Sequence, residues 1–194
     1  MKLVTTLLIT LFLSLSVSAQ ADAEKEVRRI LEDRDQQIKA LLGPEDSDFS
    51  EQQLEELRLI VNDMMDYGAM ARFALADTFD ELETEQQNEF VDLFAKIIRD
   101  QSLSQLDIYR ARVEYDEIEV EDNLATVSTT AVMDDNRIVV IYRMQHKQEQ
   151  WVITDMSIDD AWTAESYRRS FQNIIRRRGF DALMDNLRRR AGQA

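Results

Sequence analysis

Apolar residues fall at helical spacing in the first and last parts of this chain, and they alternate with polar residues in the middle. Val27, Ile30 and Leu31 begin one such series, which continues to Leu42. Positions three and four apart share one face of a helix. We therefore predict a first helix that ends at the Gly-Pro breaker at 43–44.

Three polar residues further along have the features of helix N-caps. Ser50 precedes Gln53, and Thr84 precedes Gln87, at the spacing of a capping box. Asp66 can cap a short helix between these two. The sequence therefore predicts three more helices, each with one apolar stripe.

Alternating segments follow, rich in Val, Ile, Thr, Tyr and Trp, which is typical of strands. These segments are 110–115, 124–133, 137–145 and 150–158. Tight turns are predicted at 134–136 and 147–149. Short turns between successive strands indicate an antiparallel meander.

Helical spacing returns near Glu165 and runs to Arg178, where Gly179 is a natural stop. A last short helix is predicted from Asp181 to Arg190. Helices, then strands, then helices indicate an α+β fold. We expect a curved antiparallel sheet of about four strands, covered by the N-terminal and C-terminal helices.

The first 21 residues have the three regions of a secretory signal peptide. Lys2 is their only charge, Leu3–Leu13 is almost purely apolar, and small residues precede possible cleavage points at Ala19 and Ala21. A membrane span needs about 20 consecutive apolar residues, more than this segment has. No Cys follows it for a lipid anchor. We predict a signal peptide over 1–21, cleaved near Ala19 or Ala21, and export from the cytoplasm.

Residues 22–194 have the size of a single domain. The chain contains no Cys, so packing rather than disulfides must stabilise it. With a single histidine, His146, zinc sites made of Cys or of several His are excluded. We predict no metal site, no cofactor and no catalytic residues, and the motifs of serine hydrolases, P-loops and zinc proteases are absent.

His146 and the acidic run 116–122 each allow a functional interpretation and a purely structural one. His146 lies at an expected strand end without the partners of a catalytic triad, so we interpret it as a surface residue. The acidic run 116–122 lacks the order and the glycine of a calcium loop. A solvated strand edge, which discourages aggregation, is the preferred interpretation.

The chain has a net charge of −15, which argues against nucleic acid as a partner. Eight arginines nevertheless lie between Tyr167 and Arg190, against only Asp181 and Asp185. Such arginines are most often the solvated face of a helix. The alternative is a surface that meets lipid phosphate or an acidic partner.

Short segments form a series along the chain from about residue 63 to 187. They are Asp66–Leu75, Thr84–Gln87, Phe90–Phe94, Val140–Arg143, Trp151–Asp155, Tyr167–Phe171 and Gly179–Leu183. In order and spacing this series resembles the MlaC family, the toluene-tolerance type of periplasmic phospholipid-binding proteins. The chain departs from the family pattern at Ala76, where Gly is usual, at Phe79, where Trp is usual, and at 159–162, where a Gly-Val-Ser type of stretch is common.

The resemblance implies a phospholipid shuttle in the periplasm. Such proteins are expected to carry phospholipid between an inner-membrane ABC transporter complex and an outer-membrane lipoprotein complex, and so to maintain outer-membrane lipid asymmetry. The lipid tails would lie in an apolar cavity between sheet and helices, with the head group facing solvent. We expect a monomer that is not an enzyme.

The apolar stripes, read with this resemblance, predict a set of lipid-contacting residues. They are Met64, Met65, Met70, Phe73, Phe90, Phe94, Ile97, Val113, Val127, Val140, Tyr142, Trp151, Ile153, Tyr167, Phe171 and Ile174. Methionine suits irregular apolar walls because it is unbranched and flexible. The same periodicity is typical of an ordinary packed core, which is the competing interpretation.

Two other functions remain open from the residues alone. A cone-shaped α+β fold can host a hydrolase or an isomerase, which would need polar groups that converge in the pocket. Tyr142, Asp155 and Tyr167 are the candidates for that role. A periplasmic scaffold is the third possibility.

Overall fold

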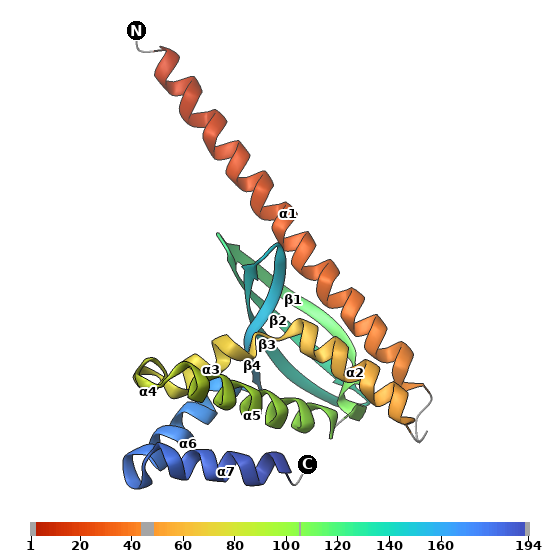
Figure 1. Ribbon diagram of the computed structural model, residues 1–194. Coiled ribbons are helices and arrows are strands. Elements are labelled where there is room, and N and C mark those ends of the chain that lie inside the picture. Colours follow the sequence, from red (N-terminus) through yellow and green to blue (C-terminus); the bar gives the residue numbers. More distant parts are fainter. Residues whose placement is uncertain (1–2, 44–48, 105, 193–194) are drawn as a thin grey trace.

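The computed structural model describes residues 3–43, 49–104 and 106–192, with side chains from residue 20 onward apart from Asp107. Helices precede and follow one antiparallel sheet (Figure 1), so the predicted α+β class is confirmed. The elements in chain order are α1 (Leu3–Leu42), α2 (Glu51–Met64), α3 (Tyr67–Leu75), α4 (Asp77–Glu81), α5 (Thr84–Leu103), the 3₁₀ helix η1 (Leu106–Arg110), β1 (Arg112–Glu121), β2 (Leu124–Met133), β3 (Asn136–Lys147), β4 (Gln150–Ile158), β5 (Ala161–Trp162), α6 (Thr163–Arg178) and α7 (Phe180–Gly192).

The sheet is a meander in which each strand pairs with the next, in the order β1-β2-β3-β4-β5. The fifth strand has two residues and extends the expected four. The acidic segment lies on β1, an edge strand, as its interpretation requires. Register shifts leave one extra residue on β1, Asp116, and one on β4, Thr154, which lies opposite Arg143 and Met144 of β3. Bulges of this kind bend a sheet and increase its twist, which accounts for its curvature.

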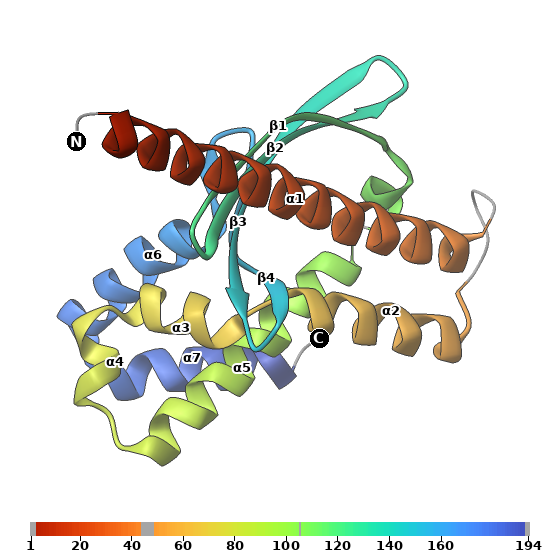
Figure 2. The same ribbon diagram turned by 90° about the horizontal axis from the view of Figure 1, so that it is seen from above.

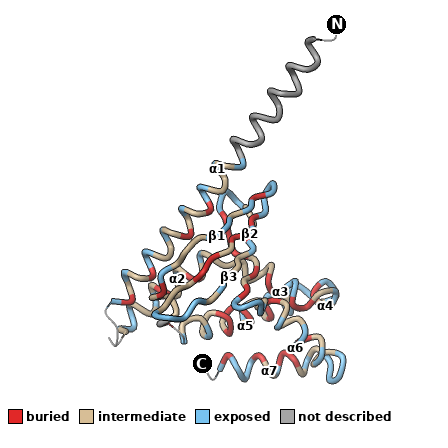
Figure 3. The backbone as a smooth tube through the Cα atoms, turned by 180° about the vertical axis from the view of Figure 1, so that it is seen from behind, coloured by how far each residue is buried: buried red, intermediate tan, exposed pale blue. Residues whose placement is uncertain are grey.

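One half of the sheet is packed against α1. Val27 and Leu31 on α1 are buried against Val127, Trp151 and Ile153 of the sheet. Figure 2 shows α1 crossing this face, and Figure 3 shows its buried positions recurring along the helix. The amphipathic pattern predicted for this helix therefore serves to cover the strands.

A second and larger core contains no strand at all. It is formed by α3, α4, α5, α6 and α7, with Phe90, Phe94 and Phe171 almost fully buried at its centre. A third cluster joins α1, α2 and η1 around Leu42 and Leu57. The part of the sheet between these cores borders a cavity.

The helix starts follow the predicted caps with one exception. Ser50 and Gln53 form a capping box on α2, and the Asp66 carboxylate accepts the Ala69 N–H at the start of α3. The box predicted at Thr84 and Gln87 is wrong by one residue.

The N-cap of α5 is Glu83, whose N–H donates to the Gln86 side chain at 3.1 Å. Gln87 instead donates to the carbonyls of Phe79 and Leu82, and so ties α5 to the preceding turn. Glu83 and Gln86 have the same three-residue spacing as Thr84 and Gln87. The spacing alone is therefore compatible with either Glu83 or Thr84 as the N-cap. At the other end of the chain, Gly179 ends α6 with φ +83°, as expected.

The signal peptide prediction concerns residues 1–21, of which 1–2 and the side chains before Gln20 lie outside the described part. The backbone of 3–21 belongs to α1. Among the helices described here, none has both the length and the hydropathy of a membrane span.

Candidate functional site

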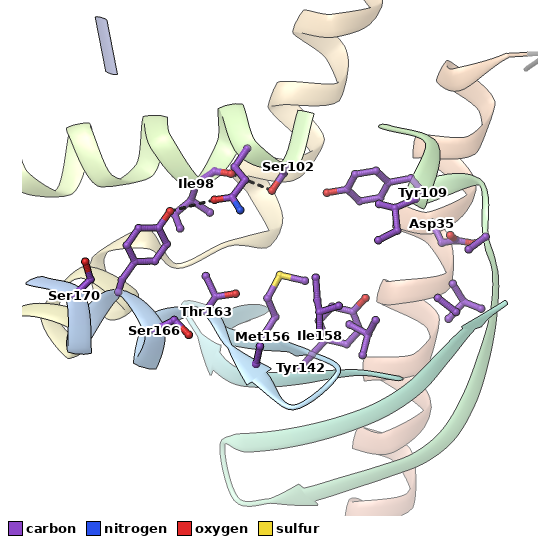
Figure 4. A pocket seen from close by; sticks show the side chains of 18 residues that line it. Asp35, Ile98, Ser102, Tyr109, Tyr142, Met156, Ile158, Thr163, Ser166 and Ser170 are labelled. Carbon is purple, nitrogen blue, oxygen red and sulfur yellow. Dashed lines mark hydrogen bonds between the residues drawn. The ribbon is translucent and has the colours of Figure 1, made fainter. Parts of the chain in front are cut away.

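A cavity of about 530 Å³ lies between the sheet, η1 and helices α1, α5 and α6 (Figure 4). Its volume falls within the range of small-molecule sites, about 300–1,000 Å³. It is lined by Asp35, Ile98, Gln101, Ser102, Ile108, Tyr109, Ala111, Val113, Ala131, Val140, Tyr142, Met156, Ile158, Ala161, Thr163, Ser166, Tyr167 and Ser170.

The sheet supplies the apolar wall of the cavity. Side chains alternate between the two faces of a strand, so one face of β2, β3 and β4 presents Ala131, Val140 and Met156 to the cavity. Tyr142 and Met156 are direct partners across β3 and β4, and both line it. Small residues such as Ala131 leave the space that a bulkier side chain would fill.

The helices supply a polar rim. Thr163, Ser166 and Ser170 are spaced by three and four residues on α6, so their hydroxyls lie on one face of that helix. Gln101 on α5 lies across from them. The exposed members of the lining are Gln101, Ile158, Ala161, Ser166 and Ser170. The cavity therefore meets solvent between the start of α6 and the end of α5.

Tyr167 links this rim to the helical core. Its hydroxyl donates a hydrogen bond of 3.1 Å to the Gln101 side-chain oxygen. Its ring packs edge-on against Phe94, with centroids 5.0 Å apart, and at 5.3 Å from Phe171. One aromatic side chain is thus shared between the cavity wall and the core behind it.

Asp35 is the one charged side chain in the lining. Its carboxylate pairs with Lys39 at 2.8 Å on the same helix. The lining contains no arginine or lysine. An anionic group deep in the cavity would find no opposite charge there, so the lining favours apolar and hydroxyl-bonding ligands.

Burial raises the pKa of Tyr142 to about 12 and also raises the pKa of Tyr109, so both phenols are neutral at pH 7. Asp155 does not line the cavity. Its carboxylate accepts the backbone N–H groups of Met156 and Ala164 at 2.8 and 2.9 Å, and so caps the start of α6. Burial raises the pKa of Asp155, against the effect of these hydrogen bonds. Of the three candidates for acid–base chemistry, only Tyr142 and Tyr167 line the cavity.

The structure distributes the residues predicted to contact lipid over four places. Val113, Val140, Tyr142 and Tyr167 line the cavity. The helical core contains Met70, Phe90, Phe94, Ile97, Phe171 and Ile174. The core between α1 and the sheet contains Met64, Met65, Val127, Trp151 and Ile153, and Met64, Trp151 and Ile153 also line a smaller hollow of about 150 Å³. Phe73 is 39% exposed on α3, in a surface groove.

Sequence reasoning missed the polar part of the lining. Apolar periodicity does not indicate the hydroxyls of Thr163, Ser166 and Ser170, because they lie beside the apolar stripe of their helix. Their helical spacing beside Tyr167 is the signal that could have found them. Asp35 gave no signal, since an aspartate on an amphipathic helix normally faces solvent. Within the described residues, no group of His, Cys, Asp and Glu is arranged to hold a metal ion.

Comparison with known proteins identifies a family and a similar fold. A family model described as MlaC protein matches residues 26–189. A solved structure with a TM-score of 0.74 is the phospholipid-binding protein from Ralstonia solanacearum in complex with a phospholipid. It is 21% identical, and the alignment covers 88% of this chain and 97% of that chain, so the likeness shows the fold. No curated protein matches the chain significantly in sequence.

Proposed function

The chain belongs to the MlaC family, and from that premise we propose that it binds phospholipid and carries it through the periplasm. Its partners would be an inner-membrane ABC transporter complex and an outer-membrane lipoprotein complex, and its role the maintenance of outer-membrane lipid asymmetry. The observation that carries the proposal is the cavity with an apolar sheet wall and a polar rim. The Ralstonia protein of the same fold was solved with a phospholipid.

The lining suits the tail of a lipid better than its head group. Each methylene removed from water contributes about 0.8 kcal/mol, so ten methylenes would contribute about 8 kcal/mol. The lining offers no cation to a phosphate. The acyl tail would therefore lie against Val140 and Met156, and the head group would remain at the rim near Ser166 and Ser170.

The same features favour a carrier over an enzyme. Neutral phenols with a pKa near that of Tyr142, about 12, are poor acids and bases at pH 7. Asp155 is occupied by two backbone N–H groups outside the cavity. We infer a binding protein that holds its cargo without reacting with it.

Export fits the way α1 is packed. The first buried residue of the described side chains is Val27. Cleavage after Ala19 or Ala21 would therefore release the signal and leave the contacts between α1 and the sheet intact. The mature protein would then be free to diffuse between two membranes.

The test is to purify the protein from the periplasm, extract it with organic solvent and analyse the extract by mass spectrometry. We expect phospholipid in near-stoichiometric amount. Delipidated protein should also take up labelled phospholipid from vesicles. An empty protein that takes up no lipid contradicts the proposal, and N-terminal sequencing of the same sample tests the cleavage point.

A further inference from the structure

Three consecutive arginines lie where α6 ends and α7 begins. Arg176, Arg177 and Arg178, here termed the arginine corner, are exposed in the last turn of α6. Basic residues at this position stabilise a helix C-terminus. That effect accounts for some positive charge here, but it does not require three free side chains.

The arginine corner differs from most of the chain in its lack of partners. Elsewhere on the described side chains before α6, each lysine and arginine has a carboxylate, a polar group or an aromatic ring as partner. In α6 and α7, Arg168 and Arg190 stack on rings, and Arg169 and Arg188 form ion pairs. Among described cations, only the arginine corner and Arg189 lack such a contact.

The arginine corner lacks ion pairs among the described residues, although most charges on the chain are negative. The chain carries 38 acidic residues against 23 basic ones, so carboxylates are in excess. Asp181 follows the corner by three residues and forms no ion pair with it in the described structure. Positive charge that stays unpaired on an acidic protein is available to an external anion.

We propose that the arginine corner is a docking contact for an anionic membrane surface. Successive helical residues point about 100° apart, so the three guanidinium groups spread around the end of α6 and form no flat face. Protein interfaces have an apolar centre, and the exposed large apolar side chains of the described chain are Leu59, Phe73, Leu124, Val139 and Ile158, none of which is on α6 or α7. A layer of lipid phosphates needs neither a flat face nor an apolar centre.

Docking at the corner would leave the cavity accessible. Arg177 lies fourteen positions after Thr163 on the same helix, a rise of about 20 Å. The corner could therefore touch a membrane while the start of α6, where Thr163 lines the cavity, stays off its surface.

The experiment is co-sedimentation of the mature protein with vesicles at low ionic strength. Vesicles of phosphatidylethanolamine with phosphatidylglycerol are compared with neutral phosphatidylcholine vesicles. We expect binding to the anionic vesicles only, reversed by salt. An arginine near an anionic surface contributes about fivefold in affinity, so replacing all three with glutamine should weaken binding on the order of 100-fold.

A matched control removes the same charge elsewhere. The triple change Arg28→Gln, Arg29→Gln and Arg58→Gln alters arginines that form ion pairs at the surface of α1 and α2. It should leave most of the binding intact. Replacing the arginine corner with three lysines should also preserve binding, because diffuse attraction needs charge rather than guanidinium geometry.

Three outcomes overturn the proposal. They are a wild-type protein that ignores anionic vesicles, equal losses in the two glutamine triples, and loss of binding in the folded lysine triple. Circular dichroism and the melting temperature establish folding for each variant. The lipid content of the purified protein is measured separately, so an empty cavity would refute the carrier function without deciding the docking contact.

Discussion

The hydroxyl of Tyr167 on α6 donates a hydrogen bond to the side-chain oxygen of Gln101 on α5, at 3.1 Å. Both residues line the cavity, and Gln101 is exposed at its rim. The bond therefore joins the two helices at the side on which the cavity meets solvent. A cargo that enters or leaves by this side must pass close to it.

Replacing Tyr167 with Phe should speed the exchange of bound lipid a few-fold. The change removes the hydroxyl but retains the ring packing on Phe94. A hydrogen bond of this kind contributes about 1 kcal/mol or less to stability, so the melting temperature should change little. Exchange is measured by transfer of labelled phospholipid to acceptor vesicles.

The control for that experiment is a double-mutant cycle with Gln101→Ala. If the two side chains act through their shared bond, the double variant should exchange lipid no faster than either single variant. Additive rate increases would show that the bond is not the element that controls exchange.

Asp155→Asn should preserve the fold and change how the stability of the protein depends on pH. Burial raises the pKa of Asp155 above its ordinary value of 3.8. The folded state therefore binds this proton more tightly than the unfolded state does. The stability that the proton confers is complete below pH 3.8 and is lost as pH rises through the raised pKa.

Asparagine retains the oxygen that accepts the N–H groups of Met156 and Ala164 but carries no charge. The difference in melting temperature between Asp155→Asn and wild type should therefore increase as pH rises through that window. Asp155→Ala should cost about 1–2 kcal/mol below this window, because the α6 start loses its cap. The cost should become smaller as pH rises, because the wild type then loses the stability that the proton confers. A melting temperature for Asp155→Asn that follows wild type at all pH values would contradict this assignment.

The order of the elements could be predicted from the sequence because periodicity and capping are local. The alternation in 124–158 arises from strands with one buried face, and short turns between them permit only a meander. The register of the cap at Glu83 was missed, because neighbouring residues offered equivalent side chains. Local patterns thus predict which elements exist better than where each begins.

The cavity could not be located in the same way. Phe94 and Val140 are both apolar residues on periodic stripes, yet Phe94 is in the helical core and Val140 lines the cavity. An apolar side chain of the sheet belongs to the core where a helix packs against it and to the cavity wall where none does. Which of the two applies depends on how far the helices extend over the sheet. That is a property of the tertiary arrangement, and the bulges at Asp116 and Thr154 that curve the sheet leave no clear mark in the sequence.

Substitutions at Phe94 should separate core from cavity. Phe94→Ala should destabilise the protein by about 3–5 kcal/mol, because its ring is fully buried between Phe90, Tyr167 and Phe171. Phe94→Leu, a smaller change, should retain lipid binding at a modest cost in stability. Denaturant unfolding and lipid content measure the two effects. A stable Phe94→Leu variant without lipid would place this residue in the binding site after all.

Ala131→Trp should block lipid uptake while the fold persists. Ala131 is a half-buried residue of β2 whose small side chain faces the cavity, so an indole there would occupy the volume assigned to the acyl tail. Thr126→Trp on the same strand is the matched control, because residues an odd number apart point to opposite faces and Thr126 is exposed. Uptake of labelled phospholipid should fall at least tenfold in Ala131→Trp and stay near wild type in Thr126→Trp. Since a filled cavity loses no hydrogen bond, Ala131→Trp should also melt within a few degrees of wild type, and full uptake by that folded variant would mean that the lipid is held elsewhere.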